Sequence, residues 1–194
     1  MKQRMIGTES SNTYQDKIDN GFFAKYMSGK GLDIGFAGYT DEGGAVILDT
    51  AIGVDLDYPG YDGVTLPFES ESQDYVYSSH CLEHVAEYEQ ALREWHRVVK
   101  VGGFIVIVVP HQYLYEKKHQ LPSKWNKGHL RFYTPGSLAL EVENSLAPNS
   151  YRVRLLEDGD KGFVYSIPPE KHSGGQYEIT LVLQKIKPPA WELA

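Results

Sequence analysis

The sequence predicts an α/β fold with an open, mainly parallel sheet, helices on both faces and an antiparallel edge at the C-terminal end. Three observations lead to this prediction. Short apolar strands alternate with helical segments along most of the chain, which is the pattern of a parallel sheet. Residues 104–109 are apolar at every position, as expected of a strand that helices cover on both faces. Residues 151–156 and 177–186 close the chain as a pair of strands.

The first half of the chain predicts one helix and two strands. A helix is expected over residues 14–27, and Gly29 supplies its stop signal. Residues 31–35 and 51–56 are predicted strands, each followed by glycine or acidic residues. The apolar run over residues 43–50 fits either a helix or a strand.

The second half begins with a predicted strand over residues 74–78, followed by the clearest helix of the chain. Apolar residues spaced three and four apart form one stripe of this helix: Val85, Tyr88, Leu92, Trp95 and Val99. Gly102-Gly103 is predicted to end the helix, and Pro110 to close the strand after it. A short helix is predicted over residues 137–146.

The composition indicates one acidic globular domain. The chain has 194 residues, of which 41% are hydrophobic and 23% charged, and this balance is typical of a folded domain. Residues 1–13 are polar and are expected to form a loose N-terminal segment, with residues 14–194 as a single domain. The formal net charge of -7 gives no general attraction for phosphate backbones, so nucleic acid is not expected as a partner.

The cysteine count and the apolar runs exclude other classes of protein. Cys81 is the only cysteine, which rules out an internal disulfide and a cysteine-rich metal site, and no metal site is predicted. The N-terminus lacks a secretory signal, and the longest apolar run is too short to cross a bilayer. A cytoplasmic protein without membrane insertion is therefore expected.

Two acidic residues at strand ends predict a nucleoside-binding site. Asp33 precedes the glycine turn at Gly35, where bare backbone can approach a ligand, and Asp55 offers an acceptor for a ribose diol. Ligands of open α/β sheets bind beyond the carboxyl ends of the strands. The turn over residues 35–40 lacks the Gly-x-Gly-x-x-Gly pattern of a pyrophosphate loop, so a nicotinamide dinucleotide is a weaker hypothesis. A cationic cofactor without phosphates fits the carboxylates better.

Taken together, these residues resemble the class I S-adenosylmethionine-dependent methyltransferases, and within them the type 11 group. The resemblance covers roughly residues 30–143 and implies a Rossmann-like fold with S-adenosylmethionine as cofactor. The matching motifs occur in the family's order: Leu32-Asp33-Ile34-Gly35, Gly53-Val54-Asp55, Leu66-Pro67-Phe68, Asp74-Tyr75-Val76, Cys81-Leu82-Glu83-His84-Val85 and residues 92–103.

The resemblance implies a cofactor-binding set at the ends of the first three strands. Its members are Asp33, Gly35, Phe36, Ala37, Gly38, Asp55, Leu56, Asp62, Ser79 and His80. Asp62 would lie near the adenine, and Ser79 and His80 near the methionine end of the cofactor. Ala37 stands where the family usually has glycine. Only six residues separate Asp55 from Asp62, which predicts a truncated adenine pocket.

The acceptor side is predicted from the segment after the central strand. Methyl transfer requires in-line placement of the nucleophile and, for a hydroxyl, removal of a proton. His111 follows the central strand directly and is the predicted catalytic base. Residues 111–134 are rich in aromatic and polar side chains, which suits a small-molecule or saccharide acceptor. The segment resembles methyltransferases of bacterial surface-polysaccharide synthesis, but an ordinary loop over the sheet edge fits equally well.

Two functions from different classes therefore stay open. The leading hypothesis is a methyltransferase that O-methylates a small-molecule or saccharide hydroxyl. Ala37 and the short connection before Asp62 also fit a methyltransferase-like fold that has lost turnover and serves as a binding or assembly module. The two C-terminal strands could extend the sheet into a homodimer.

Overall fold

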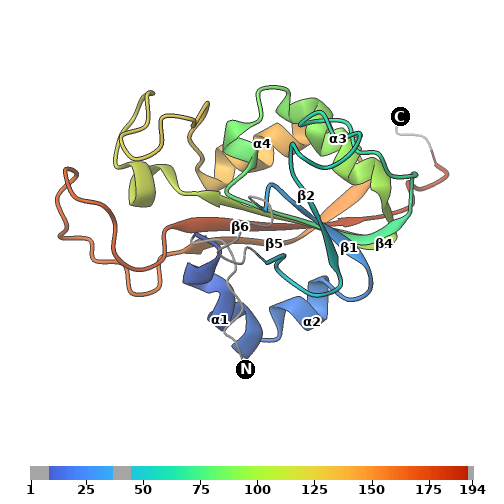
Figure 1. Ribbon diagram of the computed structural model, residues 1–194, viewed down its shortest axis with the longest axis horizontal. Coiled ribbons are helices and arrows are strands. Elements are labelled where there is room, and N and C mark those ends of the chain that lie inside the picture. The colour runs from blue at the N-terminus through green and yellow to red at the C-terminus, as the bar shows by residue number, and fades with distance from the viewer. Residues whose placement is uncertain (1–8, 37–44, 192–194) are drawn as a thin grey trace.

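The computed structural model describes residues 9–36 and 45–191, which form a sheet of six strands in the order β2-β1-β3-β4-β6-β5 (Figure 1). The strands are β1 Gly31–Ile34, β2 Ala51–Val54, β3 Gln73–Ser79, β4 Val99–Pro110, β5 Tyr151–Gly159 and β6 Glu178–Lys185. Neighbours from β2 through β4 are parallel, whereas β6 pairs antiparallel with both β4 and β5. The predicted sheet with its antiparallel edge is confirmed.

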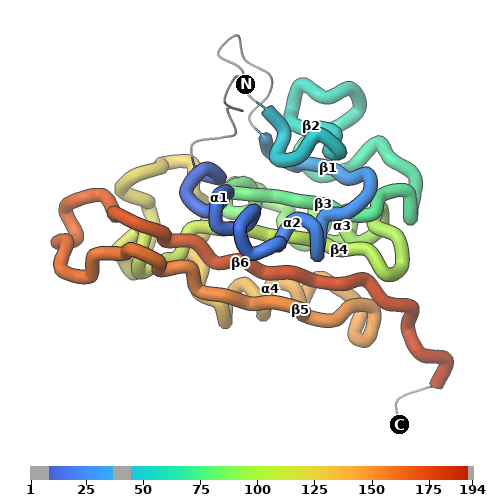
Figure 2. The backbone as a smooth tube through the Cα atoms, turned by 90° about the horizontal axis from the view of Figure 1, so that it is seen from below, coloured from blue at the N-terminus to red at the C-terminus, as the bar shows by residue number. Residues whose placement is uncertain are grey.

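Helices cover both faces of this sheet (Figures 1 and 2). One face carries α1 Ser11–Asp19 and α2 Phe22–Tyr26, and the other carries α3 Tyr88–Val98 and α4 Pro135–Ser145. The central strand β4 directs Ile105, Ile107 and Val109 into the core under α3 and α4, and Val106 and Val108 into the core under α2. This division explains the unbroken apolar run of β4, because both of its faces are buried. None of the helices in the described part of the chain is long and apolar enough to span a membrane.

The single helix predicted over residues 14–27 is two helices in the structure. Gly21 has a φ of 73°, a left-handed conformation that interrupts the helix. The side chain of Asn20 accepts a hydrogen bond of 3.0 Å from the backbone N–H of Phe22, which starts α2. Because α1 begins at Ser11, the last three residues of the segment predicted to be loose are helical.

The helix before the central strand ends earlier than predicted. α3 ends at Val98, and Gly102-Gly103 lies inside β4 instead of terminating the helix. The buried Lys185 of β6 explains this end, because its Nζ donates to the backbone oxygens of His96 (3.0 Å) and Val99 (2.9 Å). This contact joins residues about ninety positions apart, so the local pattern could not reveal it.

The remaining connections place two short turns at the carboxyl ends of the strands. A 3₁₀ turn, η1 Leu82–His84, follows β3, and a π-helical turn, η2 Gln112–Glu116, follows β4. The segment over residues 45–50 is neither helix nor strand. α4 starts at Pro135, where Thr134 and Ser137 form a capping box, slightly before its predicted start.

Replacing Lys185 by methionine is expected to destabilise the fold by about 2 kcal/mol, because the last carbonyls of α3 lose a charged donor while remaining covered. Urea unfolding followed by circular dichroism measures the change. Lys187→Met is the matched control, because Lys187 is exposed two positions further along the chain. Equal midpoints for the two variants would contradict the proposed cap.

Candidate active site

A cavity of about 410 Å³ lies at the carboxyl ends of β1, β2 and β3. The residues that follow these strands form one side of it: Gly35, Asp55, Leu56, His80 and Cys81. Residues 61–64 and 84–87 complete the wall. This is the edge at which open α/β sheets bind their ligands, and the volume lies within the usual range for a cofactor site.

The cavity floor at the end of β1 requires glycine. Gly35 has a φ of 73°, and a Cβ atom there would lie 2.5 Å from the Sγ of Cys81. Both facts exclude a side chain, so the backbone of the turn after β1 is bare where it meets the cavity. This is the feature that the first sequence motif predicts.

Gly35→Ala is expected to cost about 1–2 kcal/mol from the left-handed backbone alone, with a further cost from the contact with Cys81. The measurement is a thermal melt beside Gly136→Ala, where the nearest atom would be 3.9 Å away and φ is not left-handed. We expect a lower midpoint only for Gly35→Ala. A melting temperature of Gly35→Ala equal to that of the unsubstituted protein would contradict the requirement for glycine in this turn.

Two carboxylates converge on the cavity from different segments. Asp55 follows β2, and its Oδ1 accepts the N–H of Leu56 at 2.7 Å. Asp62 accepts the N–H groups of Val64 (2.9 Å) and Thr65 (2.6 Å), and these hydrogen bonds hold the pKa of Asp62 below its usual value. Both carboxylates are thus fixed in orientation at the same wall. Such an arrangement is suited to pairing with ribose hydroxyls or an exocyclic amine.

The apolar part of the cavity wall suits a flat ring. Leu56 is 72% exposed although its side chain is large and apolar, and Val64 and Val85 also line the cavity. A nucleoside would cover this apolar surface while its hydroxyls meet the carboxylates. The residues present therefore fit a cationic nucleoside cofactor without phosphate groups.

Three predicted cofactor residues lie near the cavity but do not line it. Asp33 is buried, and its Oδ2 accepts the N–H of Ile47 at 2.6 Å, so it anchors the chain entering β2. Ser79 is buried at the end of β3, where it accepts a hydrogen bond of 3.0 Å from Ser10. The Phe36 ring packs against the bare backbone of Gly53, where a Cβ atom would be 2.5 Å away.

The other members of the predicted set divide into two groups. Ala37 and Gly38 lie outside the residues that the structure describes. Gly35, Asp55, Leu56, Asp62 and His80 line one cavity, as the sequence predicts for a common site.

His111 is held by contacts that leave no ring nitrogen for a substrate. Its Nδ1 accepts from the backbone N–H groups of Tyr113 (3.0 Å) and Leu114 (3.3 Å), and its Nε2 lies 3.3 Å from the Oδ1 of Asp158. Burial lowers the pKa of His111, and the nearby Asp158 opposes this only in part. The ring caps η2 and does not line the cavity, so its contacts do not support the predicted role as base.

His80 forms the end of the cavity nearest β3. Its backbone is left-handed (φ 51°), which is uncommon for a residue with a side chain. The Nε2 lies 3.1 Å from the Oε1 of the buried Glu178. Burial by itself would lower the pKa of His80, but its hydrogen bond with Glu178 and the charges of Glu178 and Glu83 raise it overall.

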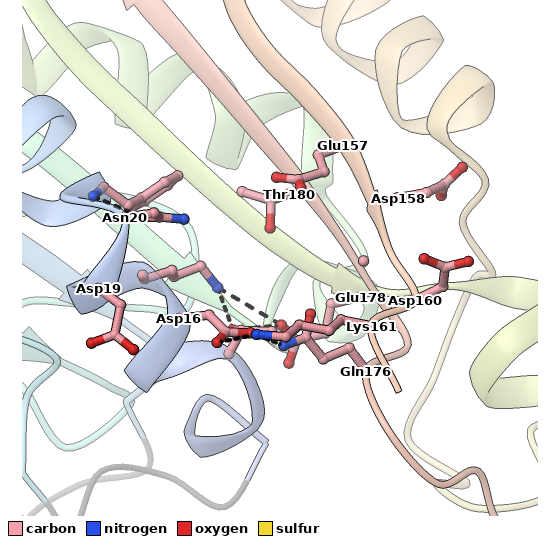
Figure 3. A pocket seen from close by; sticks show the side chains of 14 residues that line it. Asp16, Asp19, Asn20, Glu157, Asp158, Asp160, Lys161, Gln176, Glu178 and Thr180 are labelled. Carbon is pink, nitrogen blue, oxygen red and sulfur yellow. Dashed lines mark hydrogen bonds and ion pairs between the residues drawn. The ribbon is translucent and has the colours of Figure 1, made fainter. Parts of the chain in front are cut away.

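A second cavity, of about 450 Å³, lies between α1 and strands β5 and β6 (Figure 3). Its acidic side chains are Asp16, Asp19, Glu157, Asp158, Asp160 and Glu178. Asp16 is paired with Lys161 (2.7 Å) and Gln176 (2.6 Å), and Thr13 donates to Glu178. Glu178 lies beside Pro110 at the end of β4, but none of the residues that line this cavity follows β1, β2 or β3, so the first cavity is the candidate active site.

The comparisons with known proteins agree with this geometry. Residues 46–107 match the family described as "Methyltransferase domain". The fold resembles an S-adenosylmethionine-dependent methyltransferase from Thermotoga maritima, with a TM-score of 0.55, 16% identity and 90% of each chain covered. A second such methyltransferase, from Aquifex aeolicus, has a TM-score of 0.54 at 11% identity and covers 91% of this chain and 93% of its own. The chain therefore contains a stretch similar to methyltransferase domains and has the fold of S-adenosylmethionine-dependent methyltransferases.

The curated relatives match this chain over a short stretch. Demethylmenaquinone methyltransferase from Staphylococcus epidermidis is 43% identical over 51 residues, which is 26% of this chain and 21% of that protein. The enzyme of the same name from Lysinibacillus sphaericus is 41% identical over 51 residues, or 22% of its length. The match therefore spans about a fifth of these relatives, and it leaves the acceptor undetermined.

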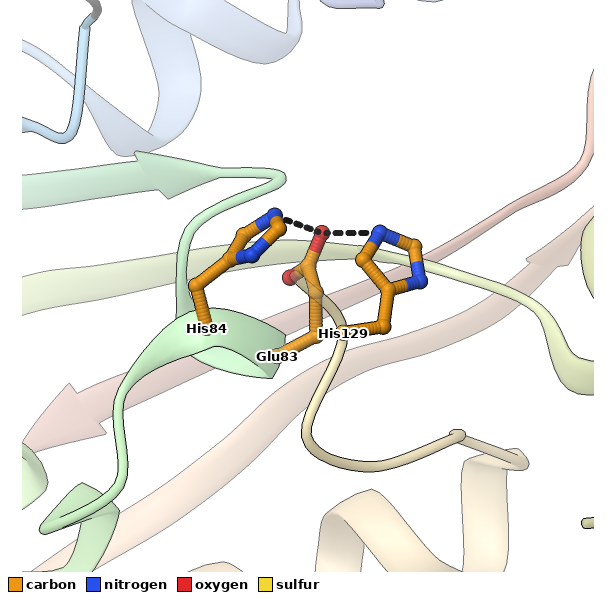
Figure 4. Close-up of side chains that lie close together, drawn as sticks. All are labelled: Glu83, His84 and His129. Atoms are coloured by element: carbon orange, nitrogen blue, oxygen red, sulfur yellow. Dashed lines mark ion pairs between the residues drawn. The ribbon is translucent and has the colours of Figure 1, made fainter. Parts of the chain in front are cut away.

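The sequence did not predict a group of side chains at the wall of the first cavity, where His84 lies. Glu83 and His84 of η1 meet His129, which precedes α4 (Figure 4). The backbone N–H of Leu130 donates to the backbone carbonyl oxygen of Glu83 at 2.9 Å and holds the two segments together. More than forty residues separate His84 from His129, so no local spacing joins them.

Proposed function

We propose that this protein binds S-adenosylmethionine in the cavity beyond β1, β2 and β3 and methylates an oxygen of a small-molecule acceptor. The observation that carries the proposal is the convergence of the bare turn at Gly35 with the carboxylates of Asp55 and Asp62 on one cavity. The cofactor supplies an activated methyl group on a sulfonium, and the protein supplies position and exclusion of water.

Each wall residue has a role that follows from its place. Asp55 accepts hydrogen bonds from the ribose hydroxyls, since it ends the strand next to Gly35. Asp62 faces the adenine side, and Leu56 covers the ring. His80 lies at the opposite end, where the methionine part of the cofactor would reach β3.

The acceptor is proposed to be small, with a saccharide hydroxyl as the narrower class. The rings of Tyr115 and Tyr133 are only 4% and 1% exposed, and Tyr115 packs against Tyr177 at 5.0 Å between centroids. These rings are therefore not available to stack on a long sugar chain. Tyr113 is 50% exposed, so its ring is open to a ligand.

Calorimetry with S-adenosylmethionine and S-adenosylhomocysteine tests the cofactor part of the proposal. We expect binding in the micromolar range, followed by transfer of an isotopically labelled methyl group to members of a panel of sugars and small alcohols. A panel that includes amines and activated carbon acids distinguishes O-methylation from N- and C-methylation. The absence of binding of either cofactor form at millimolar concentration would favour the non-catalytic binding module instead.

The homodimer is proposed through the edge strand β5. Val153 and Leu156 on this strand are 50% and 39% exposed, which leaves apolar surface at the open edge of the sheet. Light scattering after gel filtration measures the mass directly. A monomer at high protein concentration would contradict the dimer and would leave the proposed cofactor site unaffected.

A further inference from the structure

We propose that Glu83, His84 and His129 form a binding site for one divalent transition-metal ion at the wall of the active-site cavity (Figure 4). The three donor atoms lie within 4.8 Å of one another. The Nε2 atoms of His84 and His129 are 3.9 Å and 3.8 Å from the same oxygen, the Oε1 of Glu83. These distances are too long for hydrogen bonds and leave space between the donors.

The buried carboxylate of Glu83 is the main observation that supports a cation at this place. Glu83 is fully buried, and neither of its carboxylate oxygens has a hydrogen-bond partner among the described residues. Burying a carboxylate without hydrogen bonds is costly, and proteins generally avoid it unless the charge is paired or coordinates a metal. A cation bound between Glu83 and the two histidines would remove that cost.

Hydrogen bonds on the far side of each ring orient both histidines as ligands. The Nδ1 of His84 lies 2.9 Å from the carbonyl oxygen of Gly128, which can only accept, so Nδ1 carries the proton and Nε2 keeps its lone pair. The Nδ1 of His129 lies 2.5 Å from the Oε1 of Glu116. Ser123 donates to the other oxygen of Glu116 at 2.6 Å. A carboxylate or carbonyl behind each histidine is the usual outer arrangement of a metal site.

The donor set points to a zinc-like ion rather than to magnesium or calcium. Two imidazoles and one carboxylate suit Zn²⁺, Co²⁺ or Fe²⁺, whereas Mg²⁺ and Ca²⁺ prefer oxygen ligands throughout. With donors about 2.0–2.2 Å from a zinc ion, ligand atoms lie roughly 3–3.5 Å apart. Each histidine Nε2 would therefore approach the Oε1 of Glu83 by about half an ångström, and donors as far as 4.8 Å apart would approach one another by more than about one ångström. The Nδ1 of His80 is also 3.8 Å from the Oε1 of Glu83 and stands beside the three ligands.

The ion would lie where the acceptor enters, a step that rests on the proposed function. His80 and His84 line the cavity, so an open coordination position could receive the acceptor oxygen. Binding to the ion lowers the pKa of the hydroxyl, whose proton leaves to water. The oxygen then bonds to the methyl carbon while the carbon–sulfur bond breaks, and S-adenosylhomocysteine is released. The ion would thus activate the acceptor hydroxyl, a role that the sequence predicts for His111 and that the contacts of His111 do not support.

The test is titration of the metal-free full chain with Co²⁺ and Zn²⁺. We expect one equivalent of Co²⁺ to give visible d–d absorption, Zn²⁺ to displace it, and either ion to raise the melting temperature. Glu83→Gln and His129→Gln should each weaken Co²⁺ binding by on the order of 100-fold or more, and Glu116→Gln by roughly 10–100-fold. His119→Gln is the matched control, because this exposed histidine lies outside the cluster.

The outcomes separate the metal site from the proposed function. No Co²⁺ binding by the unsubstituted chain at millimolar concentration overturns the site, and this needs no variant. Unchanged affinity in Glu83→Gln and His129→Gln overturns it as well. Calorimetry with S-adenosylhomocysteine on the same samples tests the cofactor site independently of the metal site. Cofactor binding without Co²⁺ binding would therefore refute only the metal site. Co²⁺ binding without cofactor binding supports the site and refutes the proposed function.

Discussion

Asp55→Ala is expected to weaken the binding of S-adenosylhomocysteine by about 1.5–3 kcal/mol, or roughly 10–100-fold, because hydrogen bonds to a charged acceptor contribute this much. Asp55 lines the cavity directly after β2, and its carboxylate is oriented by the N–H of Leu56. The ribose hydroxyls would lose both acceptor oxygens at once, while the alanine leaves the strand itself unchanged. Isothermal titration calorimetry measures the loss.

The control for this variant is Asp57→Ala. Asp57 lies two positions further on, is exposed and does not line the cavity, yet its removal changes the net charge by the same amount. We expect its affinity for S-adenosylhomocysteine to stay within twofold of the unsubstituted protein. If both variants bound equally well, the ribose would not lie beside β2 and the cofactor site would have to be moved.

The parts of the site that could be predicted are those that topology fixes. Alternating strands and helices determine a parallel sheet, and the carboxyl ends of neighbouring parallel strands must meet at one edge. For this reason Gly35, Asp55 and His80 could be placed together before their contacts were visible. The motifs give the chemistry, and the sheet brings them to a common cavity.

What could not be predicted depends on side-chain direction and on contacts between distant residues. His111 does follow the central strand, but two backbone N–H groups of η2 bond to its ring, and it does not line the cavity. The end of α3 is set by Lys185, near the other end of the chain. Glu83 and His129 meet only because the segment before α4 folds back over η1. Contacts of this kind leave no periodic pattern in the amino-acid sequence.

Arg131→Met is expected to destabilise the protein by about 3–5 kcal/mol, because it removes a partly buried charge from a network that stays covered. The guanidinium of Arg131 donates to the backbone oxygens of Leu82 (2.8 Å), Val85 (2.6 Å) and Ala86 (3.3 Å). It also lies 3.5 Å from Glu141, which would lose this ion pair and keep its hydrogen bond from Tyr133. Urea unfolding followed by circular dichroism measures the free energy of unfolding.

The same substitution should also affect the candidate active site, because Arg131 binds the loop that forms one wall of the first cavity. Val85 and Ala86 line the cavity, so a loosened loop should also weaken S-adenosylhomocysteine binding under conditions where Arg131→Met remains folded. The stability and the affinity of Arg131→Lys should lie between those of the unsubstituted protein and Arg131→Met, since a single ammonium cannot reach three carbonyls as the planar guanidinium does. Arg152→Met is the control, as Arg152 is exposed and, within residues 9–36 and 45–191, donates only to the adjacent Tyr151 oxygen. If Arg131→Met matched Arg152→Met in stability, the segment before α4 would not be what holds the cavity wall in place.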